Sequence, residues 1–110
     1  MTVVNVAAFS KVCATREKGR SFYPLLLERA RAAHGELTVS FEGVEFVTPS
    51  FLHETVAKLL AEVPSIVHSI QIEGLREFPA QELGKIIRTE DLDVELSRTG
   101  PTSYRLAALV

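Results

Sequence analysis

Apolar and polar positions alternate along the chain with two different periods. Five runs are rich in β-branched and apolar residues, a pattern that predicts strands. These runs cover residues 2–8, 37–41, 66–73, 92–97 and 104–110. The last two flank the turn-forming segment RTGPTS, so we expect them to pair as a hairpin.

Three other stretches repeat their apolar residues every three or four positions, which predicts amphipathic helices. They cover residues 18–33, 49–63 and 76–88. The middle one has the clearest apolar stripe, and Pro64 ends it because proline disfavours helical backbone in the preceding residue. Strands and helices thus alternate, which predicts an α/β fold. We expect a single small domain over residues 1–110, with a mixed β-sheet and about three helices packed mainly on one face.

Composition and charge narrow the classes of function. The 110 residues are 46% apolar and 24% charged, with a formal net charge of −2 and no dense cluster of Lys and Arg. A nucleic-acid partner is not expected, because binding to phosphates needs such a cluster. No apolar run approaches about 18 residues, so no membrane span is expected. The single cysteine, Cys13, fits a reducing cytoplasm, which is the expected compartment.

Sequence motifs for cofactors and metals are missing. The glycines are scattered singly rather than gathered in a phosphate-binding loop, so we expect no cofactor. His34, His53 and His68 lack metal-ligand spacing with one another or with Cys13, and we expect no metal site. His68 falls on the apolar face of the predicted strand 66–73, which indicates a core residue. We expect Cys13 to be a buried thiol rather than a nucleophile.

The segment GVEFVTPSFLHE, residues 43–54, joins an extended run to the middle helix. Thr48 precedes a proline, which pushes its backbone toward the extended region, and threonine is a good N-cap residue. Pro49 then takes the first helical position, where its missing N–H costs nothing. Val47 and Leu52 have the spacing of a hydrophobic staple. All four residues predict the same helix start.

The first turn of this helix is also the candidate binding surface. Ser50 has no capping duty, and on a helical wheel Phe51 lies about 110° from the centre of the apolar stripe, among charged residues. We therefore predict that a partner binds to Thr48, Ser50, Phe51, Glu54 and Lys58, with Ser50 or Thr48 as phosphoacceptor. The alternative is that Thr48 only caps the helix, Ser50 is a small surface residue and Phe51 lies under a neighbouring loop.

Residues 37–60, LTVSFEGVEFVTPSFLHETVAKLL, resemble the STAS-like family, in particular the small STAS-like domains of unknown function. KGRSFYPLLLERA, residues 18–30, extends the resemblance, which covers about residues 16–90. More distantly, the chain is similar to the STAS domains of anti-sigma factor antagonists. In that family a serine at this junction is phosphorylated by a partner kinase, and the helix that follows docks on the kinase. The resemblance implies a regulatory module of bacterial signalling whose protein partner is a kinase-like ATPase.

The junction differs from the D-S-S-G-L pattern of those antagonists. Thr48 stands at the aspartate position, and Pro49 stands at the usual phosphoacceptor position, where proline cannot carry a phosphate. Ser50 matches the second serine, and Phe51 replaces the glycine. In this chain the phosphate would therefore be carried by Ser50 or Thr48.

Two functions are consistent with these observations. The first is a non-catalytic interaction module that docks a protein partner through the tip of the helix beginning near Pro49. The alternative is a small-ligand binder or enzyme with a site at the carboxyl ends of the strands, where Thr48, Ser50, His68 and Cys13 supply the chemistry. A homodimer that pairs through an exposed edge strand is a third arrangement, which the sequence neither supports nor excludes.

Overall fold

Five strands form the main sheet of the protein, in the order β1–β3–β5–β7–β6. The computed structural model describes residues 2–108. The strands of this sheet are β1 (Thr2–Asn5), β3 (Leu37–Ser40), β5 (Ile70–Glu73), β6 (Val94–Arg98) and β7 (Tyr104–Ala108). β1, β3 and β5 are parallel to one another, whereas β7 pairs antiparallel with both β5 and β6. The mixed sheet and the hairpin of its last two strands confirm the sequence prediction.

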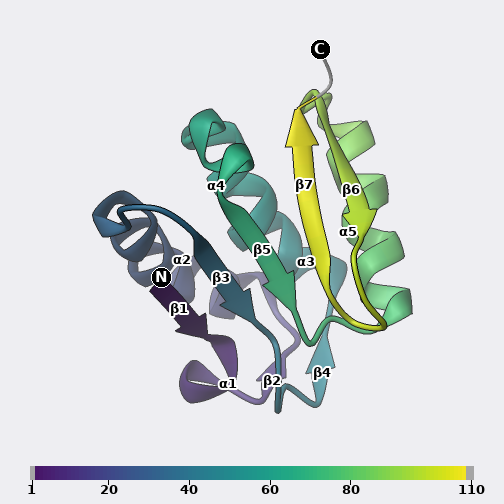
Figure 1. The fold of residues 1–110 in the computed structure, drawn as a ribbon. Helices are drawn as coiled ribbons and strands as arrows, with labels where there is room; N and C mark the ends of the chain where they lie inside the picture. Colours follow the sequence, from purple (N-terminus) through teal and green to yellow (C-terminus); the bar gives the residue numbers. More distant parts are fainter. Residues whose placement is uncertain (1, 109–110) are drawn as a thin grey trace.

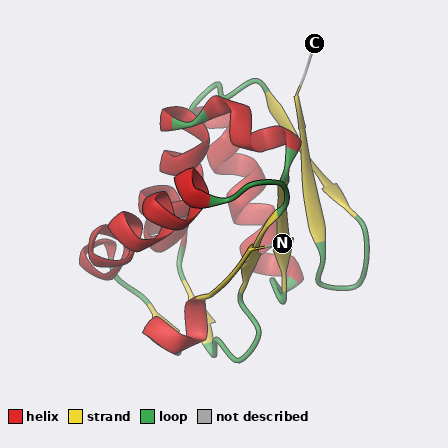
Figure 2. Ribbon diagram, turned by 60° about the vertical axis from the view of Figure 1, so that its left-hand side comes forward, coloured by secondary structure: helices red, strands yellow, loops and turns green. Residues whose placement is uncertain are grey.

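Helices cover one face of this sheet. The long helices are α2 (Arg16–Ala32) and α5 (Glu77–Thr89). Between them a continuous helical segment consists of α3 (Pro49–Leu52), the π-helical turn η1 (His53–Ala57) and α4 (Lys58–Glu62). Figure 1 shows these helices behind the strands, and Figure 2 shows them gathered to one side, which confirms the predicted α/β layering. Among the helices within residues 2–108, none has the length and apolarity needed to cross a membrane.

The core lies between the sheet and these helices. Alternate residues of a strand point to the same face, and Leu37, Val39, Ile70 and Ile72 are at most 1% exposed on the face that the helices cover. The helices contribute side chains of similar burial to the other side of the core. The apolar ones that are at most 1% exposed in α2, α5 and the segment between them are Phe22, Leu26, Phe51, Leu52, Val56, Leu59 and Leu83.

Two short strands lie outside the main sheet, next to the start of α3. β2 (Val12–Cys13) and β4 (Phe46–Val47) pair in parallel, with Val12 opposite Phe46. Val12 and Phe46 are exposed, whereas Cys13 is fully buried, so one face of this small sheet is covered and the other is open. The prediction that Cys13 is a buried thiol is confirmed.

The first predicted strand is shorter than expected. It ends at Asn5 rather than at residue 8, and Val6–Phe9 form the short helix α1. β3 ends at Ser40, directly opposite Asn5, so a longer strand would have no backbone groups to pair with. At the other end of the chain, the strand predicted over residues 104–110 is β7, and residues 109–110 lie outside the described part.

The strand predicted over residues 66–73 begins only at Ile70, which is opposite Leu37 of β3. The residues before it, Pro64–His68, form a 3₁₀-helical segment, η2. His68 is exposed on this segment, so the prediction of a core histidine on a strand face is wrong. Pro64 explains the difference, because proline at the first position favours a helical turn over a strand.

Candidate functional site

Thr48 caps the helical segment 49–62. Its backbone is extended (φ −107°, ψ 160°), and its side-chain oxygen accepts a hydrogen bond from the backbone N–H of Phe51 at 3.3 Å. The backbone N–H of Thr48 donates to the carbonyl of Cys13 at 3.0 Å, and its hydroxyl donates to the same carbonyl at 3.4 Å. The predicted cap is confirmed, and removing it should cost about 1 kcal/mol of stability. The hydroxyl of Thr48 is therefore already occupied by structural contacts.

Phe51 lies in the core rather than at the surface. Its exposure is 0%, and its ring stacks on that of Phe22 in α2, with the ring centres 6.0 Å apart. Gly19 lets the two helices approach this closely, because a β-carbon there would lie 3.3 Å from the carbonyl oxygen of Phe51. The expectation that Phe51 is an exposed docking residue is therefore wrong. The helical wheel placed Phe51 away from the centre of the apolar stripe, but α2 covers that side of the helix.

The charged residues near Phe51 on the wheel also contact α2. Glu54 accepts a hydrogen bond from Arg16 at 2.7 Å, and its side chain is only 13% exposed. The ammonium group of Lys58 lies 4.7 Å from the centre of the Tyr23 ring, a cation–π contact. Glu54 and Lys58 thus help to join two helices, and their predicted role in binding a partner stays a prediction.

An exposed aromatic surface does exist, beside the helix start. Phe46 of β4 is 57% exposed and Phe78 of α5 is 68% exposed, the highest values among the large apolar side chains of residues 2–108. Both line a groove of about 310 Å³ that also passes Thr48. The remaining apolar walls of this aromatic groove are Phe41, Val44, Val47, Pro49, Leu75 and Pro79.

The aromatic groove lies where the parallel strands end. Phe41 follows β3, Gly74 and Leu75 follow β5, and Figure 1 shows the carboxyl ends of both strands at the same edge as β4. Gly74 has φ +70°, and a β-carbon there would come within 2.5 Å of the backbone nitrogen of Glu42, so only glycine lets the loop after β5 approach the loop after β3 this closely. Arg76 also joins these two loops, since its guanidinium donates to the carbonyls of Val44 and Glu45, both at 3.3 Å.

The sequence model of a STAS-like domain of unknown function (DUF4325) matches residues 18–77, which is more than half of the chain. The chain belongs to this STAS-like family. The match confirms the resemblance seen in the sequence, although it is shorter than the expected span 16–90. It includes Phe46 and the start of α3 but ends one residue before Phe78. Neither a curated protein nor a solved structure gives a significant match.

Exposed carboxylates lie at one side of the aromatic groove of this STAS-like domain. Glu45 lines the groove itself, and Glu42 lies beside it in the loop after β3. Both residues are exposed. The only nearby cation that lines the groove within residues 2–108 is Arg76, which is bonded to backbone carbonyls. The site therefore combines an apolar floor with an acidic rim.

The four residues considered for an enzyme site do not meet in this STAS-like domain. His68 lies before the amino end of β5, whereas Thr48 lies at the edge where β3 and β5 end. Burial raises the pKa of the Cys13 thiol, and its sulfur donates to the carbonyl of Ser10 at 3.3 Å. The structure brings together only Thr48 and Cys13, through a backbone carbonyl rather than the thiol.

A polar network joins α2, the helical segment 49–62 and the end of α5. Arg16 contacts Nδ1 of His53 at 3.1 Å as well as the carboxylate of Glu54, and Nε2 of His53 contacts Glu90. The hydrogen bond from Arg16 lowers the pKa of Glu54, against a smaller opposing effect of burial. The same guanidinium nitrogen of Arg16 thus contacts both His53 and Glu54.

Proposed function

We propose that this STAS-like domain is a non-catalytic interaction module that docks a protein partner in the aromatic groove beside the helix start. The observation that carries the proposal is the pair of exposed phenylalanines, Phe46 and Phe78, on either side of apolar walls. Exposed aromatic side chains around a pocket are typical anchors of protein interfaces. Thr48 and Ser50 lie at the helix start next to this groove. The proposed docking surface therefore still includes the helix start predicted from the sequence, but its aromatic residues are Phe46 and Phe78 instead of Phe51.

The chemistry of the groove indicates what the partner presents. The floor takes an aliphatic or aromatic side chain, because its walls are apolar. The rim carboxylates Glu42 and Glu45 favour Lys or Arg beside that anchor, since complementary charge speeds association and rejects acidic partners. A kinase-like ATPase remains the proposed partner class, on the basis of the resemblance to anti-sigma factor antagonists.

Ser50 is the better of the two proposed phosphoacceptors. The hydroxyl of Thr48 caps the helix, and a phosphate on it would replace that cap. A phosphate on Ser50, which is half-buried at the second helical position, would add about −1.5 to −2 charges beside a rim that is already acidic. We expect it to weaken the docking of a basic partner. Intact-mass measurement of the domain from its host tests this, and absence of a phosphorylated form in every growth condition would contradict it.

A double replacement tests the docking surface directly. Phe46→Ser with Phe78→Ser removes both exposed rings, and we expect the affinity for a partner recovered with the wild-type domain to fall at least tenfold in calorimetry. Leu25→Ser is the matched control, because Leu25 is 40% exposed on α2 and does not line the groove. Unchanged affinity in the double variant, with an unchanged unfolding midpoint, would overturn the proposal.

A small apolar ligand is the second candidate for the same groove. Its volume of about 310 Å³ is at the lower end of the range of roughly 300–1,000 Å³ found for ligand pockets, and it lies at the carboxyl ends of strands. The two proposed functions differ in whether a protein partner or a small apolar compound fills the groove. A compound that raises the melting temperature of the wild-type domain, but not that of the Phe46→Ser, Phe78→Ser variant, would favour the ligand.

A further inference from the structure

The strand β6 forms the outer edge of the main sheet, and within residues 2–108 it pairs only with β7. The N–H of Thr99 donates to the carbonyl of Ser103 at 2.8 Å. Because every second residue of an antiparallel strand bonds to its partner, this bond shows which residues of β6 bond to β7 and which do not. Glu95 and Ser97 accordingly direct their backbone groups to β7. The backbone N–H and C=O groups of Val94, Leu96 and Arg98 point to the free edge, and an edge of this kind is a template for another strand.

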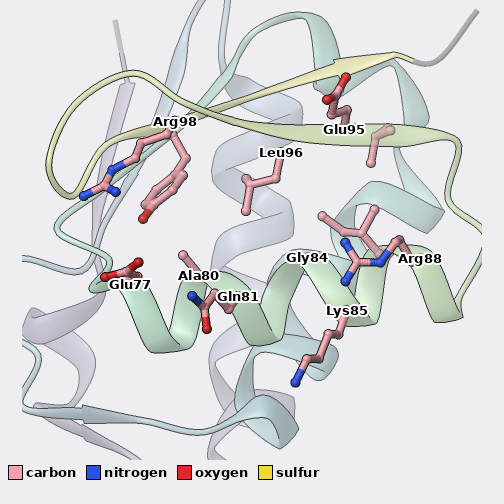
Figure 3. Close-up of a pocket in the computed structure, with 12 residues that line it drawn as sticks. Glu77, Ala80, Gln81, Gly84, Lys85, Arg88, Glu95, Leu96 and Arg98 are labelled. Carbon is pink, nitrogen blue, oxygen red and sulfur yellow. The ribbon is translucent and has the colours of Figure 1, made fainter.

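A groove of about 740 Å³ runs under this edge, between β6 and α5. Figure 3 shows Leu96 over the middle of α5, where Gly84 contributes no side chain. It also shows Glu77 at one end of the groove and Arg88 at the other. The side chains of Val94 and Leu96 are half-buried there, so the helix-facing side of the edge strand is apolar over these two residues and only partly covered, and the exposed Arg98 continues the same face.

We propose that β6 pairs antiparallel with β6 of a second copy of this chain, with the two-fold axis passing through Leu96. In this register Leu96 is opposite Leu96 of the second copy, and Val94 is opposite Arg98. Both are pairs in which the free N–H and C=O groups of one strand meet those of the other. Opposite residues share a face, so the helices of both copies lie on the same side and the two sheets become one.

Charge and apolar pairing together favour this register over its neighbours. The alternation of backbone groups also permits an axis through Val94, Glu95, Ser97 or Arg98. An axis through Val94 places Glu95 opposite Asp93 of the second copy, and axes through Glu95 and Arg98 place these charged residues opposite themselves. An axis through Ser97 avoids like charges but places the apolar Leu96 opposite Arg98. Like charges directly opposite on paired strands are destabilising. With the axis through Leu96, Glu95 is instead opposite Ser97, and no charge faces a like charge.

The helix beneath the strand has matching charge. Along the groove, α5 begins with Glu77 and ends with Lys85 and Arg88. A two-fold axis through Leu96 makes α5 and its copy antiparallel, so the acidic start of each lies on the side of the basic end of the other. The second copy therefore complements both the backbone edge and the charges along the groove.

Sedimentation equilibrium from micromolar to millimolar concentration tests the dimer. We expect the wild-type chain to shift from the mass of one copy to that of two. Leu96→Asp and Leu96→Lys should each abolish the dimer, because the residue on the axis faces itself, and an equimolar mixture of the two should restore it. Val3→Asp is the control, since Val3 is 42% exposed on the opposite edge strand, β1, and should not change the mass.

Disulfide trapping gives a second test that leaves Leu96 intact. Glu95→Cys and Ser97→Cys place thiols at exposed positions that are opposite each other only between copies in the proposed register. A mixture of the two variants should form several-fold more linked dimer than either alone, because identical positions are diagonal neighbours about 7–8 Å apart, too far for a disulfide. The native Cys13 is buried and does not compete. A chain that stays monomeric, a dimer that survives Leu96→Asp, or equal trapping in all samples would overturn the proposal.

Discussion

Phe51 and Phe46 lie on either side of the same helix cap, yet Phe51 is 0% exposed and Phe46 is 57% exposed. The difference is that α2 covers the side of the helix where Phe51 lies, through Phe22 and the close approach at Gly19. The open face of the small β2–β4 sheet, where Phe46 lies, has no such cover. Exposure at this corner is therefore decided by whether another helix packs over the residue.

Replacing each of the two phenylalanines by alanine should give the largest difference in stability between the buried and the exposed side of this corner. We expect Phe51→Ala to lower the free energy of unfolding by about 3–5 kcal/mol, because it leaves a cavity against Phe22. Phe46→Ala should change it by less than about 0.5 kcal/mol, as is usual for an exposed side chain. Urea unfolding followed by circular dichroism measures both. Equal losses in the two variants would mean that the β2–β4 face is covered too.

Replacing a glycine of α2 or of α5 by alanine should change the stability by a smaller amount. A β-carbon at Gly19 would lie 2.8 Å from the β-carbon of Glu54, so Gly19→Ala must push α2 away from Phe51. We expect a loss of roughly 1–3 kcal/mol, as for other overpacked interfaces. Gly84→Ala is the matched control, because its nearest neighbour is the flexible end of Arg88 at 3.7 Å.

In the control, alanine should stabilise α5 by about 0.5–1 kcal/mol through its better helix propensity. The measurement is again the urea midpoint of each variant against wild type. If Gly19→Ala were as well tolerated as Gly84→Ala, close approach of α2 could not be the reason that Phe51 is buried.

Local sequence patterns were sufficient for most of the fold. The order of the main-sheet strands and the three main helical segments, the final hairpin and the Thr48 cap depend on residues close in sequence, and all were predicted. The errors occurred where pairing partners far along the chain decide the outcome. β1 stops at Asn5 because β3 ends opposite it, and the strand predicted over residues 66–73 is confirmed only for Ile70–Glu73, because Ile70 is the first residue that faces β3.

In the candidate site too, features set by neighbouring residues were predicted and features set by distant packing partners were not. Thr48 and the helix tip were found from sequence, but the burial of Phe51 required knowing where α2 lies. Phe78 could have been found, since at 100° per residue it is about 180° from the buried Ile87 on the wheel of α5. Phe46 gave a weaker signal, because a strand of two residues has no clear alternation and the exposed side depends on its pairing with β2.

Removing the polar contact beside Phe51 should cause the smallest loss of stability, and the size of that loss should depend on pH. Arg16 donates to Glu54 at 2.7 Å and lowers its pKa, with further lowering by the charges of Arg20 and Lys58. A carboxyl group whose pKa is lower in the folded state stabilises the fold above its unfolded pKa of about 4.3. That contribution is lost as the pH falls through the folded pKa.

Glu54→Gln should therefore be less stable than wild type at neutral pH, and the difference should shrink below about pH 4. Urea midpoints measured across that range test the expectation. Arg16→Gln should give the same trend, and the double variant should lose no more than either single variant, because both remove one interaction. A difference that stays constant with pH would mean that Glu54 stabilises the α2 contact by packing rather than by charge. In that case the polar and aromatic halves of this interface would act in the same way.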